Sequence, residues 1–132
     1  MADAKTPAER PLSPHLQIYK PSLTMMMSIV HRITGAALYF GTILLALFLV
    51  AVAAGKDAHG IVAAVYGSFP GKVVLFGYTW ALFHHALGGV RHFIWDTGAG
   101  LTDPARETIV KATLAGSVAL TLLAWLIAGM VK

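Results

Sequence analysis

Three long stretches without a charged residue dominate the pattern of hydrophobic and polar positions, and a lysine or arginine stands at both ends of each. They cover residues 33–55, 73–90 and 112–131. At 1.5 Å per residue, each stretch would extend about 27–35 Å as a helix, which matches a hydrocarbon core about 30 Å thick. The pattern therefore predicts an all-α membrane protein with one domain over residues 1–132 and three transmembrane helices, at residues 26–55, 71–95 and 108–131.

The segments between the predicted helices differ in character. Residues 1–24 are polar and are predicted to form a short segment at the membrane interface, without the apolar core of a signal peptide. Asp3 and Glu9 argue against a mitochondrial transit peptide. The first connection holds glycine, proline and a short apolar patch that we expect along the interface. The second is a short polar loop, and its Thr102-Asp103-Pro104 is typical of a helix start.

Composition and charge narrow the class of protein. Only 12% of the residues are charged and 57% are hydrophobic, whereas soluble domains are about a quarter charged. The chain has no cysteine, so it supplies no disulfide, thiolate metal site or iron–sulfur ligand. The net charge of +4 comes mostly from residues that flank the apolar stretches, and we infer no nucleic-acid binding from it. The distribution of positive residues predicts that the N-terminus lies inside, because the inner side of a membrane protein carries more Lys and Arg. With three spans, the N-terminal side carries Lys5, Arg10, Lys20, Arg32, Arg91, Arg106 and Lys111, and the other side carries only Lys56, Lys72 and Lys132.

The second predicted span holds an unusual group of ionisable residues, in the segment FHHALGGVRHF at 83–93. A charge at the centre of a bilayer costs roughly 3 kcal/mol or more, so such residues are functional candidates. His92, close to Trp95 and Asp96, is interpreted as part of an interfacial anchor at the end of the span. His84 and His85 lie about 10 Å deeper, and they are the candidates for a buried role.

His85 has the clearer surroundings of the two. Gly88 and Gly89, three and four residues later, share its helix face and leave room there for a flat macrocycle. Imidazole is a common axial ligand of haem iron. Two alternatives stay open: a neutral histidine that hydrogen-bonds to a neighbouring helix, and two glycines that serve only close helix packing.

A second candidate group stands where the first span enters the membrane, in MMMSIVHRITG at 25–35. Ser28 and Arg32 are four residues apart and share a face, while His31 lies about 100° round the helix. A histidine and an arginine suit the anionic propionates of haem, and a hydroxyl near a cation suits a quinone oxygen. The alternative is that Arg32 reaches the lipid headgroups and Ser28 bonds to its own helix.

Taken together, RPLSPHLQIYKPSLTMMMSIVHRITG at 10–35 and HHALGGVRHFIWD at 84–96 resemble the cytochrome b556 family of succinate dehydrogenase, in its mitochondrial and alphaproteobacterial form. The resemblance covers nearly the whole chain. It implies that His85, seven residues before His92, is an axial ligand of a haem b shared with a second small anchor subunit, whereas His84 matches no family ligand. It also implies that Ser28 and Arg32 bind ubiquinone and that His31 and Arg32 lie near the haem propionates.

The resemblance implies a membrane-anchor subunit of succinate:ubiquinone oxidoreductase, in a bacterial inner membrane or, alternatively, the mitochondrial inner membrane. A flavoprotein subunit would oxidise succinate, and an iron–sulfur subunit would pass electrons to ubiquinone. This chain would shape the quinone site, hold haem and anchor the soluble subunits, with no covalent chemistry of its own. Two alternatives remain open, an anchor subunit of fumarate reductase and a haem-free helical membrane adaptor.

Overall fold

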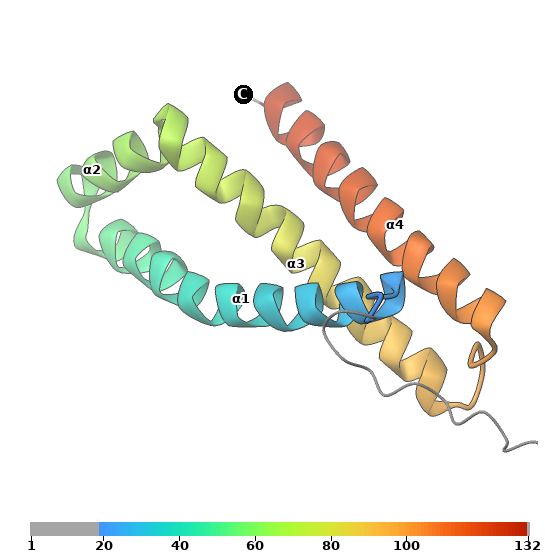
Figure 1. Ribbon diagram of the computed structural model, residues 1–132. Helices are drawn as coiled ribbons and strands as arrows, with labels where there is room; N and C mark the ends of the chain where they lie inside the picture. Colours follow the sequence, from blue (N-terminus) through green and yellow to red (C-terminus); the bar gives the residue numbers. More distant parts are fainter. Residues whose placement is uncertain (1–18, 132) are drawn as a thin grey trace, which may run out of the picture.

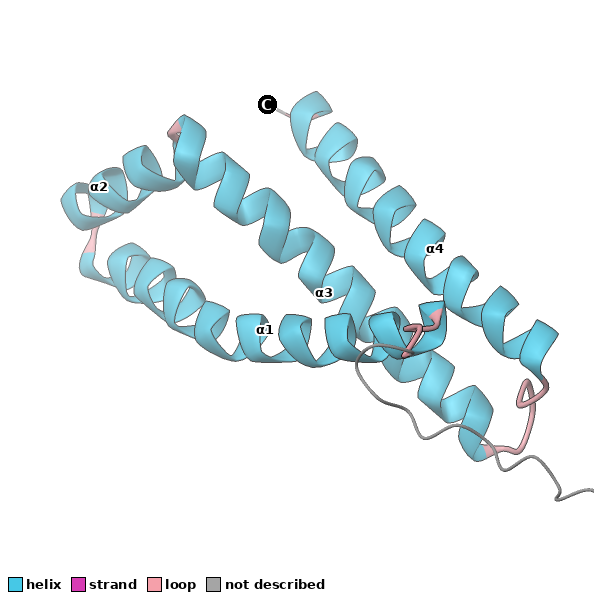
Figure 2. Cartoon of the chain, in the orientation of Figure 1, coloured by secondary structure: helices cyan, strands magenta, loops and turns pink. Residues whose placement is uncertain are grey.

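The computed structural model describes residues 19–131, which are almost entirely helical (Figures 1 and 2). No strand occurs in this part of the chain. The helices are α1 (Leu23–Ala54), α2 (Lys56–Gly67), α3 (Phe69–Asp96) and α4 (Asp103–Met130). Three of them, α1, α3 and α4, are long and apolar enough to cross a membrane, which confirms the predicted all-α fold with three spans.

The long helices begin before the apolar stretches that predicted them, α3 by four residues and α1 and α4 by nine or ten. Each follows a polar residue at its N-cap. The hydroxyl oxygen of Ser22 accepts a hydrogen bond of 3.3 Å from the amide of Met25 at the start of α1. Ser68 does the same for α3, at 3.2 Å from the amide of Gly71. Thr102 precedes α4, as the sequence predicted, although its side chain makes no capping hydrogen bond. Of the predicted interfacial segment 1–24, residues 1–18 lie outside the described part.

The first connection forms a twelve-residue helix, α2, which joins the far ends of α1 and α3 (Figure 1). Gly55 turns the chain between α1 and α2 with a φ of 108°, a backbone conformation that favours glycine. The hydroxyl of Tyr66 donates a 2.7 Å hydrogen bond to the carbonyl oxygen of Leu44 and so ties α2 back to α1.

Within the bundle, α3 packs against both other long helices. It runs beside α4, whereas α1 crosses it near the start of α1 (Figure 1). We call the end of the bundle where α1 begins and α3 ends the histidine end.

The distribution of polar and apolar side chains is inverted relative to a soluble protein. Large apolar side chains cover the outside of α1, α3 and α4, while most of the buried residues are polar. A lipid-facing surface can remain apolar, and helices in a bilayer associate through small and polar residues. The buried polar residues are Thr34, His84, Arg91, Thr113, Ser117 and Thr121.

Candidate functional site: a histidine cluster between α1 and α3

His85 of α3 lies flat against α1. Its ring is stacked on the ring of His31, with the centroids 4.1 Å apart and the planes 2° from parallel. Its Nδ1 lies 3.1 Å from the main-chain carbonyl oxygen of His31. A carbonyl oxygen only accepts hydrogen bonds, so Nδ1 carries the proton and Nε2 keeps its lone pair. Metal-binding histidines are commonly held in this way, with the second ring nitrogen donating to a carbonyl group.

His31 occupies the centre of the cluster. Its ring centroid lies 5.4 Å from that of His92, in addition to the stacking on His85. Its Nδ1 is enclosed and has no hydrogen-bond partner in the described part of the chain. Three histidines from two helices are therefore brought together at the histidine end, as the sequence suggested for His31 and His85 but not for His92.

Gly88 and Gly89 have different surroundings, although the sequence predicts the same two roles for both, a haem face or close helix packing. A Cβ atom on Gly88 would collide with the ring of His31, so Gly88 allows α1 and α3 to approach each other. That contact corresponds to the packing alternative. Gly89 has nothing within 4 Å of where its Cβ would be, so the surface beside His85 is open there.

His84 points to the opposite neighbour, α4. It is completely buried, its Nδ1 lies 3.3 Å from Oγ of Ser117, and its ring stacks on Trp80 with centroids 5.1 Å apart. Ser117 donates its own proton to the carbonyl oxygen of Leu114, so its oxygen accepts from His84. Nε2 of His84 is fully enclosed, and no external group reaches it without opening the bundle.

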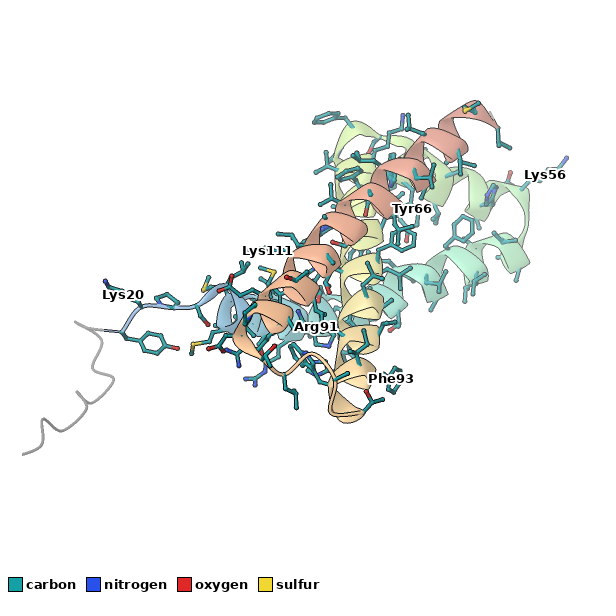
Figure 3. All side chains as sticks on the ribbon, turned by 90° about the vertical axis from the view of Figure 1, so that its right-hand side faces the viewer. Lys20, Lys56, Tyr66, Arg91, Phe93 and Lys111 are labelled. Atoms are coloured by element: carbon teal, nitrogen blue, oxygen red, sulfur yellow. The ribbon has the colours of Figure 1, made fainter. Side chains whose placement is uncertain are left out.

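Arg91, which the sequence offers only as one of the charges that predict orientation, is buried. Its exposed fraction is 2%, and its guanidinium lies 5.1 Å from the centroid of the Trp95 ring. Figure 3 shows Arg91 where the helices meet, while Phe93 projects away from the bundle. The signal for this burial is the seven-residue spacing from His84, which places both side chains on one face of α3.

Ser28 and Arg32 lie at the histidine end, one turn apart on α1. Ser28 is partly buried and Arg32 is exposed. The structure gives neither side chain a hydrogen bond or ion pair within residues 19–131. Arg32 therefore lies at the surface of this end of the bundle, with Ser28 one turn before it.

The cluster presents imidazole nitrogens at the surface without forming a complete metal site: Nε2 of His85 is not enclosed, and His92 is exposed. In the described residues no group of three or more histidine, aspartate or glutamate side chains is placed to hold a metal ion. These features define a class: a multi-span helical membrane protein with a histidine cluster at one end.

Comparisons with known proteins identify the family within this class. Residues 6–124 match the family of succinate dehydrogenase and fumarate reductase transmembrane subunits, and the chain belongs to this family. The succinate dehydrogenase cytochrome b556 subunit of Paracoccus denitrificans is 42% identical over 123 residues, which cover 93% of this chain and 94% of that protein.

More distant relatives extend the match to other bacteria and to mitochondria. The cytochrome b556 subunit of Rickettsia conorii is 35% identical over 89% of this chain and 91% of its own length. The mitochondrial cytochrome b560 subunit of Sus scrofa is 41% identical over 74% of this chain and 59% of its own length. The family and the three apolar helices place the chain in an inner membrane as a multi-span protein.

Proposed function

We propose that this chain is a membrane-anchor subunit of a succinate:ubiquinone oxidoreductase, contributing His85 as one axial ligand of haem b and part of the ubiquinone-reduction site. The family description covers succinate dehydrogenase and fumarate reductase, but the relatives described above carry the name succinate dehydrogenase. That name favours succinate oxidation over fumarate reduction. The partners proposed are a flavoprotein subunit, an iron–sulfur subunit and a second small anchor subunit.

The observation that carries the haem proposal is the hydrogen bond from His85 to α1. With Nδ1 directed at the His31 carbonyl oxygen at 3.1 Å, Nε2 keeps its lone pair and is not among the enclosed polar atoms, so it suits iron. The open surface at Gly89 leaves space beside the ring for the edge of a macrocycle. When bound, haem b adds a one-electron redox centre. His31 and Arg32 are the groups proposed for its propionates. Arg32 is exposed, whereas Nδ1 of His31 is enclosed against Gly88, which leaves Nε2 of that ring for the role.

The ubiquinone proposal rests on Ser28 and Arg32. Ubiquinone gains negative charge as it is reduced, and the guanidinium of Arg32 offers a fixed positive charge with five donors. The hydroxyl of Ser28, one turn away, gives or accepts a hydrogen bond at a quinone oxygen. Neither residue forms or breaks a covalent bond with the substrate. Their contribution is to bind and orient ubiquinone where electrons arrive from the iron–sulfur subunit.

Purification of the chain from its native membrane tests the proposal as a whole. A flavoprotein, an iron–sulfur protein and a second small membrane protein should co-purify with it. The dithionite-reduced complex should show the absorption bands of a b-type haem. An intact complex without those bands would reject the haem proposal, and purification of the chain alone would reject the anchor function.

The orientation of the chain is a separate proposal. The lysine and arginine distribution places the N-terminus and the α3–α4 loop on the cytoplasmic or matrix side. Because the chain lacks cysteine, Leu101→Cys in that loop and Ala63→Cys in α2 give a clean labelling test. An impermeant thiol reagent should reach Cys at 101 only from the inside and Cys at 63 only from the outside. The reverse result would reject the orientation, and labelling of both from one side would reject the three-span arrangement.

A further inference from the structure

The ring of His85 rests directly on the backbone of α1 at Gly35. A Cβ atom added to Gly35 would lie 2.8 Å from Cε1 and 3.3 Å from Nδ1 of His85. Real Cβ atoms essentially never approach another heavy atom within 3.0 Å. Only glycine therefore allows the imidazole to reach the carbonyl oxygen of His31 at its present distance.

Glycine at position 35 makes α1 less stable than alanine would, so another contact must account for it. Inside a helix, glycine is less favourable than alanine by about 1 kcal/mol, and Gly35 lies well within α1. Its φ is not positive, so backbone conformation does not require glycine there. The close approach of the His85 ring is the contact that accounts for it.

The same carbonyl oxygen has a second side-chain donor. The hydroxyl of Thr34, which is buried, donates a hydrogen bond of 2.9 Å to the oxygen of His31. A carbonyl oxygen has two lone pairs, and within α1 that of His31 also accepts the helical hydrogen bond from the amide of Gly35. The Thr34 hydroxyl therefore competes with Nδ1 of His85 for electron density. Three features of one helical turn thus act on a single imidazole: the His31 carbonyl, the Thr34 hydroxyl and the missing side chain of Gly35.

We infer that Gly35 and the main-chain carbonyl of His31 are positioning groups for His85, and that they set its distance, ring rotation and tautomer. The effect on haem rests on the proposal that His85 is the axial ligand. A hydrogen bond from Nδ1 to a carbonyl makes the imidazole a stronger donor to the metal. A stronger donor stabilises ferric over ferrous iron, so this turn of α1 lowers the reduction potential of the haem.

Two substitutions change the hydrogen bond in opposite directions. Gly35→Ala pushes the ring away from the carbonyl and weakens the bond, so the haem midpoint potential rises and the low-spin ferric electron paramagnetic resonance signal changes. Haem affinity falls by roughly tenfold or more, the usual effect of losing a group that orients a metal ligand. Thr34→Val removes the competing donor and strengthens the bond, so the potential falls. Both are measured on the assembled complex by redox titration and resonance spectra.

Gly77→Ala is the matched control, because it adds the same methyl group to α3 at a site with nothing within 4 Å. It should leave the potential and the spectrum as they are in the wild type. Haem with unchanged content, spectrum and potential in Gly35→Ala would overturn the inference. Shifts of the same sign in Gly35→Ala and Thr34→Val would also overturn it.

A double-mutant cycle separates this inference from the identity of the haem ligand. Gly35→Ala should lower the thermal stability of the complex in the wild-type background and have little effect in a His85→Ala background, because the colliding ring is then gone. Additive effects would overturn the positioning role. Full haem retention in His85→Ala would instead reject His85 as the ligand, while a non-additive cycle would still support the contact.

Discussion

His84 and His85 are neighbours in the sequence, yet they belong to two different interfaces of α3. Successive helical residues point about 100° apart, so His84 turns to α4 and His85 to α1. The α4 side encloses its histidine completely and ties Nδ1 to a hydroxyl oxygen of Ser117. The α1 side also ties Nδ1, but to a carbonyl oxygen, and leaves the ring partly exposed.

The difference lies in the second ring nitrogen. Nε2 of His84 is among the enclosed polar atoms without a partner, and Nε2 of His85 is not. The two interfaces are also built from different residues. Hydroxyl side chains on α4 bond back to their own helix and present a polar surface to His84, whereas Gly35 and Gly88 let rings lie against backbone between α1 and α3. One interface uses its histidine for packing, and the other holds its histidine with a nitrogen available for a ligand.

The largest expected effect is on haem content. His85→Ala should lose most of the bound haem, because it removes the accessible nitrogen. His84→Ala should keep haem and lower thermal stability, because it leaves a cavity in the bundle and removes the hydrogen-bond donor to the Ser117 oxygen. The measurement is the absorbance of the reduced b-type bands per flavin in the purified complex.

Equal haem loss in the two variants would remove the distinction between the interfaces. Loss in the His84 variant alone would mean that the ligand faces α4 after all. His84→Gln, which retains a polar group for Ser117, is a milder control in case the cavity of His84→Ala prevents assembly.

The helices and the difference between His84 and His85 can largely be predicted from residues close together in the sequence. Uncharged stretches of membrane-spanning length predict the three helices, and the i+3 and i+4 glycines distinguish His85 from His84. The start of α4 at Asp103 follows from the local chemistry of Thr102 and Pro104. These features depend on residues within a few positions of one another, where helical geometry is fixed.

Contacts between helices are what the sequence leaves undetermined. The approach of Gly35 to His85 joins residues 50 positions apart, and nothing in either local pattern pairs them. Gly88 is expected on the haem face, and the crossing of α1 also brings the His31 ring against it. Arg91 enters the sequence analysis only as one of the charges that predict orientation, and the packing of α3 against its neighbours buries it. Crossing angles and helix rotations decide these cases.

A second expected effect is on ubiquinone reduction at the α1 side. Ser28→Ala and Arg32→Leu each remove a proposed hydrogen bond to ubiquinone that involves a charged group or the negative charge that develops on reduction. Such a hydrogen bond is worth about 1.5–3 kcal/mol. Succinate–ubiquinone activity should therefore fall roughly tenfold or more. Succinate oxidation with an artificial acceptor, which takes electrons from the soluble subunits before they reach the membrane, should be nearly unchanged. It serves as the control.

Ser28→Ala is the cleaner of the two variants, since Arg32 is also proposed to lie near a haem propionate. Unchanged quinone reduction and unchanged sensitivity to quinone-site inhibitors in Ser28→Ala would show that its hydroxyl serves only the helix entry. The quinone site would then lie in the partner subunits.

The smallest expected effect comes from the matched serine on the other interface. Ser117→Ala removes the acceptor for Nδ1 of His84, and polar contacts between membrane helices are worth about 0.6–2 kcal/mol. The free energy of unfolding of the complex should fall by that amount, which a lower thermal transition would report. Haem content, haem potential and quinone activity should stay at wild-type values. Ser28→Ala and Ser117→Ala make the same chemical change on different helices. Ser28→Ala should lower quinone activity, whereas Ser117→Ala should lower only the stability of the complex. A loss of haem or of quinone activity in Ser117→Ala would mean that the α3–α4 interface takes part in the redox site and is not only structural.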